Sequence, residues 1–390
     1  MDKNILIFIS RILCYESNRF FVSEMERRLQ DYGYEVEVCE IDLEDNEIES
    51  KLMSFVGRDF DAIIDFNSAL PRLEMEDGER YLDQINAPFY NYIVDHPLYH
   101  HPVIKLDLKR SNVICIDRKH KEYITTHYSG INKVIFMPLG AMEALNVVPY
   151  EQRKINVLFS GSYQSSSEMM GQMKEMKAGE TIYLLIQELQ KNTFQTQEAA
   201  LKKILEQRGE VMSNNEFTNC LNSHYLAERY VRACFREKLI QTLLDHHIDI
   251  TVYGSGWEDF KCSNKEHLMI KNSVSFPVSL EIIADSKIVL NIMPWFKDGI
   301  HDRVLSAMVN GAVCVTDSST YMKENFKDGE DLVYYSLDEL DKLPKKIMEL
   351  LDNPNQARRI SECGYKVVKE KHMWKNRIEE NIEKIINKNE

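Results

Sequence analysis

The sequence predicts an α/β protein with two halves, each containing a parallel sheet. Apolar runs of strand length alternate with segments of helical periodicity in both halves. A polar stretch with Pro149, residues 140–153, separates the two series, and the apolar run Asn156–Phe159 starts the second one. Strands that alternate with helices need crossover connections, which favour parallel sheets buried on both faces. We therefore expect two Rossmann-like domains.

The first half, residues 1–150, has six expected strands. They are Asn4–Ile9, Tyr34–Ile41, Asp61–Phe66, Ala87–Val94, Asn112–Ile116 and Lys133–Met137. Helical periodicity lies between several of them, in Asn18–Tyr32, Ile48–Val56 and His120–His127. The alternation of apolar and polar residues in the strands and the wider spacing in the helices are the signals that distinguish the two.

The second half, residues 151–370, loses its strand signals from about residue 165 to residue 246. We interpret this stretch as a helical insertion with helices at Thr181–Lys191, Glu198–Gln207, Asn215–Leu221 and Tyr225–Leu244. The strands expected after it are Ile248–Tyr253, Val274–Phe276, Lys287–Ile292 and Ala312–Thr316. Helices at Asp338–Leu351 and Asn355–Glu370 close the domain, and a last segment, 371–390, follows.

The composition is that of a globular protein, with 44% hydrophobic and 28% charged residues among 390. A net charge of −14 argues against nucleic acid as the main partner. The eight cysteines show no metal-binding spacing, so we expect reduced structural thiols and neither a metal nor a cofactor. The first strand is too short for a signal sequence, and no run has the length of a membrane span. We expect a cytoplasmic protein.

One segment, residues 291–319, contains a candidate anion site. Asp302 is the expected N-cap of a helix that follows a strand and a loop. The loop brings Lys297, His301 and Arg303 beside the first N–H groups of this helix. Helix N-termini and cations together favour a bound anion, most often a phosphate.

The same segment resembles a known family. From Asp298-Gly299 to Asp317 the sequence is similar to the donor-binding segment of group-one glycosyltransferases, and specifically to their spore-maturation-protein-like branch. In the wider family two glutamates stand eight positions apart, and Asp298 and Ser306 occupy those positions here. The end of the chain, His372 to Arg377, is similar to the family's terminal pattern. The resemblance implies the GT-B fold, in which two Rossmann-like domains face each other across a cleft and the last helix crosses back to the first domain.

The resemblance also implies roles for single residues. Arg303 would stabilise the departing diphosphate of a nucleotide sugar, because a guanidinium can bind two phosphate oxygens at once. His301 would contact a phosphate or the sugar, or only cap the loop. Asp298 would contact sugar hydroxyls, or only form a turn. The other expected donor contacts are Gly161, Ser162, Gly254, Ser255, Gly256, Phe276, Gly299, Asp302 and Ser306.

Two further groups of polar residues are open to more than one interpretation. Asp95 and His96 follow an expected strand and are candidates for acid/base catalysis, although solvated loop residues would look the same. Arg229, Arg232 and Arg236 share one helical face. Salt bridges within the helix explain this arginine row more simply than contacts to an acidic acceptor do.

We therefore expect a hexosyltransferase-like enzyme that moves a sugar from a nucleotide diphosphate sugar to an acceptor hydroxyl, with retention and without a metal. The second domain would bind the donor and the first the acceptor, which the sequence does not identify. Such enzymes build glycans or glycoconjugates, and a lipid-linked acceptor would bring peripheral membrane contact. Two alternatives are a nucleotide-sugar epimerase with the same fold and a non-catalytic nucleotide-sugar-binding subunit.

Overall fold

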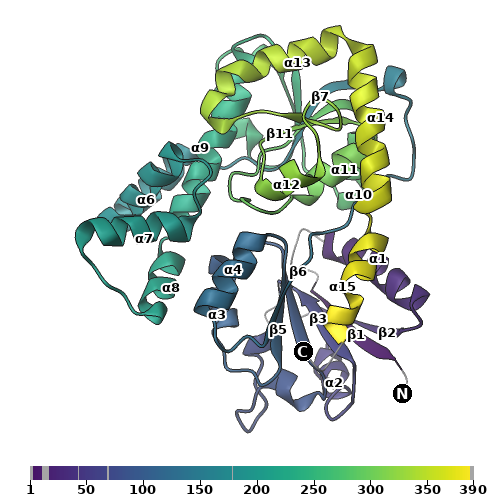
Figure 1. The fold of residues 1–390 in the computed structure, drawn as a ribbon, viewed down its shortest axis with the longest axis vertical. Helices are drawn as coiled ribbons and strands as arrows, with labels where there is room; N and C mark the ends of the chain where they lie inside the picture. Colours follow the sequence, from purple (N-terminus) through teal and green to yellow (C-terminus); the bar gives the residue numbers. More distant parts are fainter. Residues whose placement is uncertain (1–2, 11–16, 43, 68–69, 178, 387–390) are drawn as a thin grey trace. The chain divides into compact units, whose positions relative to one another are not determined.

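The structure is a computed structural model that describes residues 3–10, 17–42, 44–67, 70–177 and 179–386. The chain divides into two compact units (Figure 1). Unit 1 comprises Met1–Gly140, Asn214–Asn222 and Trp374–Glu390, and unit 2 comprises Ala141–Ser213 and Ser223–Met373. The two α/β halves that the sequence predicts, each with a parallel sheet, are confirmed.

Unit 1 contains a six-stranded parallel sheet with the strand order β2-β1-β3-β4-β5-β6. The strands are β1 (Asn4–Ser10), β2 (Glu35–Ile41), β3 (Ala62–Phe66), β4 (Phe89–Ile93), β5 (Ser111–Cys115) and β6 (Lys133–Phe136). The helices of this unit include α1 (Ser17–Asp31), α2 (Ile48–Met53), α3 (His101–Ile104) and α4 (Arg118–His127). The central strands are buried along their whole length, as their near-continuous apolar runs require.

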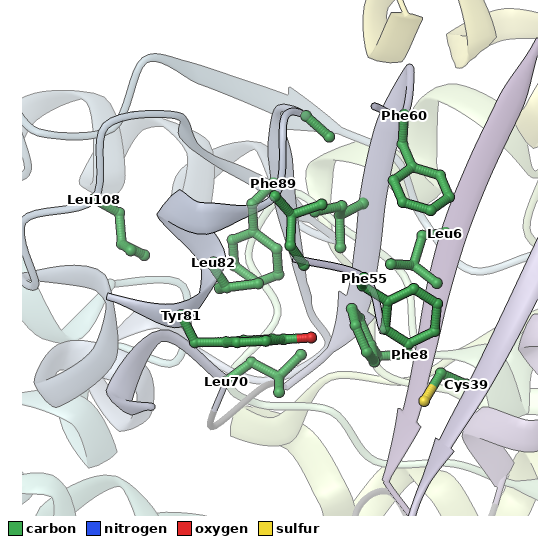
Figure 2. Close-up of a cluster of buried hydrophobic side chains, with 13 residues drawn as sticks. Leu6, Phe8, Cys39, Phe55, Phe60, Leu70, Tyr81, Leu82, Phe89 and Leu108 are labelled. Atoms are coloured by element: carbon green, nitrogen blue, oxygen red, sulfur yellow. The ribbon is translucent and has the colours of Figure 1, made fainter. Parts of the chain in front are cut away.

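One face of this sheet is covered by a cluster of buried aromatic and aliphatic side chains (Figure 2). Phe8 of β1 meets Phe55 edge to face, with ring centroids 5.7 Å apart. Tyr81 lies in the same cluster and donates its hydroxyl to the Leu52 carbonyl at 2.7 Å. The hydroxyl can therefore be buried without losing its hydrogen bond, and the cluster holds the segments between the strands against the sheet.

The last helix, α15 (Trp374–Ile386), belongs to unit 1 and packs against α1. The rings of Phe21 and Trp374 lie 5.8 Å apart. The Tyr90 hydroxyl donates to the carbonyl of Ile385 at 2.7 Å. Gly140 passes so close to Trp374 that an added Cβ would come within 2.5 Å of its backbone nitrogen. A side chain at position 140 would therefore displace the start of α15.

Unit 2 contains a second six-stranded parallel sheet, with the order β12-β11-β10-β7-β8-β9. The strands are β7 (Ile155–Ser160), β8 (Ile250–Tyr253), β9 (Leu268–Lys271), β10 (Ser286–Leu290), β11 (Val313–Thr316) and β12 (Val333–Tyr334). The helices beside and after the sheet are α10 (Phe276–Ala284), α11 (Asp302–Val309), α12 (Thr320–Asn325), α13 (Leu343–Asp352) and α14 (Pro354–Lys371).

The sequence prediction is wrong for Val274–Phe276, which was expected to be a strand. Phe276 begins α10, with Ser275 at the N-cap position and Pro277 in the first turn. Proline suits this place because its missing N–H has no partner at a helix start. The strands β9 and β12 were not predicted. Both are short, with four and two residues, so their apolar patterns are too brief to identify from sequence.

The predicted insertion forms α5 (Ser166–Glu175), α6 (Glu180–Lys191), α7 (Gln197–Arg208), α8 (Asn214–Ser223) and α9 (Tyr225–Leu244). Four of these helices lie in unit 2, but Asn214–Asn222 of α8 belongs to unit 1. The Asn219 Oδ1 atom lies 2.9 Å from His101 Nε2, and Phe217 stacks on the ring of His127. The insertion is thus divided between the units, and not confined to the second domain as the sequence suggested.

Arg153, at the end of the predicted linker, is a buried structural residue of unit 2. Its guanidinium donates to the carbonyls of Ser286, Asn310 and Gly311. It therefore holds the end of α11 against the start of β10. The seven cysteines among the described residues are free thiols, and Cys14 lies outside the described part of the chain. Among the described residues, no helix is both long enough and apolar enough to cross a membrane.

Candidate functional site

The strand order of unit 2 reverses direction between β7 and β10. The chain continues from β7 to β8 and β9 on one side, and from β10 to β11 and β12 on the other. Open α/β sheets bind ligands beyond the carboxyl ends of the strands at such a reversal. The loops that follow β7 and β10 and the start of α11 are located at this edge of the sheet.

Glycines and serines from the ends of β7 and β8 pack together at this edge. Gly161 donates its N–H to the Tyr253 carbonyl at 2.8 Å, and the Ser255 hydroxyl lies 3.0 Å from that of Ser162. A Cβ at Gly254 would come within 2.4 Å of the Gly161 carbonyl oxygen. Gly256 is restricted in the same way, by the Tyr163 carbonyl at 2.7 Å. The glycines are therefore needed for the two loops to approach each other, and all five predicted residues of these loops lie together.

Trp257 supports this pair of loops, and the sequence did not single it out. Its side chain is fully buried, and its indole N–H donates to the Gly161 carbonyl at 2.8 Å. The indole packs between the rings of Phe159 and Tyr163, with centroids 5.7 and 5.4 Å away. A tryptophan directly after a Gly-Ser-Gly run at a strand end was the available signal.

The N-terminus of α11 is capped by His301, and not by Asp302 as the sequence suggested. His301 Nδ1 accepts from the Arg303 N–H at 3.1 Å, and the His301 carbonyl accepts from the Val304 N–H at 3.1 Å. Asp302 Oδ1 lies 2.6 Å from the same imidazole nitrogen. Burial raises the pKa of Asp302, but His301 and Arg303 lower it more, so the net pKa is below the ordinary value. The N–H groups of Arg303 and Val304 are thus already hydrogen-bonded within the protein. Positive charge for binding an anion here comes from the cationic side chains.

Arg303 is half-buried at the switch between β7 and β10. Its Nη1 donates to Asn291 Oδ1 at 2.9 Å, and its Nη2 would lie 3.7 Å from a Cβ built on Gly161. Burial lowers the pKa of Arg303 from its high ordinary value, which leaves the guanidinium charged at neutral pH. Asn291, fully buried after β10, also donates through Nδ2 to Thr316 Oγ1 at 2.9 Å. A polar residue that ends an apolar strand was the signal for Asn291.

The arginine row of α9 joins the two loops of the site. Arg236 donates to the Ser162 carbonyl and lies over the Phe159 ring, 5.6 Å from its centroid. Arg232 lies 4.6 Å from the centroid of Trp295, in the loop after β10, and pairs with Glu228 at 3.3 Å. One salt bridge within the helix, as the sequence predicts for this row, is thus present between Arg232 and Glu228. Helix α9 also brings Arg232 and Arg236 to the edge where Gly161 and Arg303 lie.

The remaining predicted donor residues lie near the same loop but have mainly structural contacts. Gly299 is buried, and its carbonyl accepts from Ser319 Oγ at 2.5 Å. Asp298 beside it is half-buried, and Ser306 is buried on α11, 3% exposed. Lys297 donates to the Thr193 carbonyl at 2.6 Å. Phe276 begins α10, a helix that packs on α11.

Asp95 and His96 lie in unit 1, after β4. His96 is buried and caps the 3-10 helix η4 (Pro97–His100), since its Nδ1 accepts from the Leu98 N–H at 3.1 Å. Its ring lies 4.7 Å from that of His120. Asp95 is exposed, and its Oδ2 accepts from the Asn67 amide at 3.0 Å. The two candidates therefore differ, with Asp95 open to solvent and His96 held in a cap.

The neighbouring histidines of unit 1 are neutral at physiological pH. Burial lowers the pKa of His100 to about 4, against an opposing effect of Asp95, and burial lowers the pKa of His120 well below its ordinary value. In the described residues, no group of three or more His, Cys, Asp or Glu side chains is arranged to hold a metal ion. Because the imidazoles are uncharged, their rings can pack in contact with one another, as those of His96 and His120 do at 4.7 Å.

Residues 232–383 match the family model described as glycosyl transferase-like. This segment includes most of α9, the loops after β8 and β10, and α11. It therefore contains Arg232, Arg236, Gly254, His301 and Arg303. The loop after β7, with Gly161 and Ser162, precedes it. A search of curated protein sequences found no match.

Three solved structures resemble this chain at low sequence identity. An α-glucosyltransferase in complex with UDP-glucose and DNA containing an abasic site is 13% identical, with a TM-score of 0.59 over 98% of this chain and 99% of the other. HepE from Anabaena, in complex with UDP and glucose, is 10% identical, with a TM-score of 0.54 over 98% and 99%. TarM from S. aureus, in complex with ligands that include UDP, is 12% identical, with a TM-score of 0.52 over 87% of this chain and 58% of the other.

These structures share the GT-B architecture of two α/β domains with parallel sheets, and this chain has the same fold. The present chain spans 58% of the length of TarM. The family match covers α11, the loops after β8 and β10, and Arg232, Arg236 and Arg303, but not the loop after β7. Residues 232–383 therefore resemble the glycosyl transferase-like family, within a chain that has the GT-B fold.

Proposed function

We propose that this protein transfers a sugar from a nucleotide diphosphate sugar to an acceptor hydroxyl. The observation that carries the proposal is the meeting of Arg303, Arg236 and the glycine loops at the strand-order reversal of unit 2. A diphosphate needs cations beside a backbone that can approach it closely. The UDP in complexes of three proteins of similar fold is consistent with such a donor.

The chemistry requires the donor diphosphate to leave with the electron pair of its bond to the sugar. Arg303 is the residue that we assign to the charge that develops on the leaving oxygen. Its guanidinium is held in advance by Asn291, so little reorganisation is needed as the charge forms. The acceptor oxygen bonds to the same sugar carbon, and its proton passes to the departing phosphate. This course gives retention and needs no metal. If inversion occurs instead, the exposed carboxylate of Asp95 is our candidate for the base.

The test uses the full chain with UDP-glucose, UDP-N-acetylglucosamine and GDP-mannose, each labelled in the sugar. We expect one of these donors to give free nucleoside diphosphate through transfer or slow hydrolysis. Activity should persist after exhaustive chelation, and NMR of the product should show the donor's anomeric configuration. An altered sugar still attached to its nucleotide would indicate an epimerase. Binding without turnover of any donor, with every acceptor offered, would indicate a non-catalytic subunit.

A further inference from the structure

Unit 2 contains a pocket of about 680 Å³ beyond the carboxyl ends of β11 and β12. Its walls are formed by the end of α12, the 3-10 helix η8 (Leu337–Lys342), the start of α13 and, after β10, by Pro294 and Phe296. Figure 1 shows β11, α12 and α13 in this part of the unit. A volume of several hundred Å³ is typical of a small-molecule site.

The pocket is separate from the candidate donor site. Gly161, Gly254 and Arg303 are absent from its lining. Phe296 forms part of its wall, and the Phe296 ring lies 5.8 Å from the ring of His301, the residue that caps α11. A molecule in the pocket would lie across the 291–301 loop from the candidate donor contacts, so it would be neither the donor nor the acceptor.

Two polar side chains of the lining have unused binding capacity. The Tyr334 hydroxyl is buried and has no hydrogen bond within the described part of the chain. Lys323 lies 5.1 Å from the centroid of the Phe194 ring and pairs with no carboxylate among the described residues. A buried polar atom without a partner is costly, so a ligand that bonds to the Tyr334 hydroxyl would remove that cost.

The lining favours an anionic ligand, although the protein as a whole is acidic. Four lysines and three carboxylates line the pocket, which leaves a formal charge of +1 against −14 for the whole chain. Phe194, beside the unpaired Lys323, is 57% exposed and offers a flat apolar face. A ring that carries hydroxyls and one phosphate or carboxylate group fits this combination of an aromatic face, a cation and a hydroxyl.

Wall residues of the pocket also hold the loop that leads to the donor contacts. Tyr335 lines the pocket, and its hydroxyl donates to the Asn291 carbonyl at 2.7 Å. Asp317, also in the lining, accepts from the Met293 N–H at 2.8 Å. Asn291 in turn accepts from Arg303, the residue that we assign to the leaving diphosphate. Hydrogen bonds within unit 2 thus connect the pocket to Arg303.

We propose that this pocket is an effector site, which binds a hydroxylated ring compound with a phosphate or carboxylate group and strengthens donor binding when it is occupied. The effect on the donor rests on the glycosyl transfer proposed above, whereas binding in the pocket does not. Lys323 would pair with the anionic group, Phe194 would pack on the ring, and the Tyr334 hydroxyl would bond to a ring hydroxyl.

The coupling follows from the wall that the 291–301 loop provides. Pro294 and Phe296 belong to this loop, so the pocket is complete only when the loop is in the position that the structure shows. In the same position Asn291 holds Arg303. A ligand that needs the loop there binds this arrangement better than a displaced one, and it thereby also favours donor binding.

The first experiment measures binding of glucose 6-phosphate, glucuronate, glucose and inorganic phosphate to the full chain by calorimetry. We expect one of the two anionic sugars to bind at least about 10-fold more tightly than glucose or phosphate, because only these sugars combine a ring with an anionic group. Tyr334→Phe and Lys323→Ala should each weaken that binding by about 3- to 10-fold, the effect of one hydrogen bond or ion contact. Lys345→Ala, an exposed lysine next to the pocket residue Lys346, is the matched control and should leave it unchanged.

The second experiment measures the coupling in two ways. Saturating anionic sugar should tighten UDP binding by about 5-fold or more, the range typical of linked sites. It should also change the fluorescence of Trp295 in the 291–301 loop, and Trp295→Phe separates this signal from those of the other two tryptophans. Tyr335→Phe removes the hydrogen bond to the loop, so it should reduce both effects while the sugar still binds.

Failure of all four compounds to bind would overturn the proposal, as would unchanged sugar binding in both Tyr334→Phe and Lys323→Ala. Displacement of the bound sugar by UDP would overturn it too, because the pocket would then belong to the donor site. So would a bound sugar that alters neither UDP affinity nor Trp295 fluorescence. A sugar-dependent Trp295 signal in a protein that binds no UDP and turns over no donor would count against the proposed function alone.

Discussion

The Arg303 guanidinium donates to Asn291 Oδ1 at 2.9 Å, which fixes the arginine beside the carboxyl end of β10. This is its one side-chain hydrogen bond to the described residues. An arginine has five donors, so the others can bind a ligand in a geometry that the protein has already set. The cost of orienting a long side chain is largely met before the donor binds.

Arg303→Ala should reduce kcat on the order of 10²–10³-fold, because one preorganised charge-stabilising group is lost at the leaving oxygen. The variant should also lose about 1–3 kcal/mol of stability, since Asn291 Oδ1 is buried and would lack its partner. Arg303→Lys should recover part of the rate, because an ammonium keeps the charge and not the planar fork. Steady-state kinetics and denaturant unfolding separate the two effects.

Ser306→Ala is the control for Arg303→Ala, since it lies on the same helix and lacks the carboxylate that the family has there. We expect little change in rate. A parent-like rate for Arg303→Ala would mean that another residue stabilises the diphosphate.

Gly254→Ala should disrupt the glycine loops. The added Cβ would come within 2.4 Å of the Gly161 carbonyl oxygen, and φ is +154° at this position. Overpacking of this kind typically costs about 1–3 kcal/mol, and a shift of either loop should raise KM for the donor. The control is Gly171→Ala in α5, where nothing lies within 4 Å. It should stabilise the helix by roughly 0.5–1 kcal/mol without affecting KM. The same change in stability and donor KM in both variants would contradict the close approach of Gly254 to the Gly161 carbonyl.

Arg236→Ala should weaken donor binding more than it weakens the fold. The side chain donates to the Ser162 carbonyl and covers the Phe159 ring, so its loss frees the loop after β7. We expect KM for the donor to rise by about 10-fold, the equivalent of a charged hydrogen bond of roughly 1.4 kcal/mol. Lys238→Ala, an exposed position on the same helix, should leave KM unchanged. If Arg236→Ala and Lys238→Ala have the same donor KM, α9 does not contribute to donor binding through Arg236.

Asp317 should make the stability of unit 2 depend on pH. Burial raises the pKa of its carboxyl to about 7, against the lowering effects of the Met293 N–H and Lys297. The folded protein therefore holds a proton that the unfolded chain releases at about pH 4, so stability falls as pH rises from about 4 to 7 and is constant above. Asp317→Asn should gain stability relative to the parent across that window, on the order of 1–4 kcal/mol.

Denaturant unfolding at pH 4.5, 6 and 8 measures this difference. Asp341→Asn, on the exposed surface, is the control and should track the parent at all three values. If the free energies of unfolding of Asp317→Asn and the parent differ by the same amount at all three pH values, Asp317 is ionised throughout the range.

The positions of three predicted contact residues show where sequence reasoning reached its limit. Asp302 was the expected cap of α11, yet the helix begins one residue earlier and His301 accepts from the Arg303 N–H, which makes Asp302 the first helical residue. Arg303 was expected at an exposed helix start and is half-buried against Asn291. Phe276 was expected in a strand and begins a helix. Short-range sequence patterns located these segments. The capping residue, the burial of the arginine and the type of element depended on contacts that those patterns do not contain.

The sequence by itself determined the two parallel sheets, most of their strands and the loops that carry the glycines, because buried parallel strands are continuous apolar runs and need glycine where two backbones meet. Only the tertiary structure decided that Arg236 donates to the Ser162 carbonyl and that the Trp257 indole donates to the Gly161 carbonyl. It also decided that part of α8 belongs to unit 1 and that Phe296 lines a pocket. Each of these depends on side chains from distant segments meeting in space, and local periodicity carries no information about which segments those are.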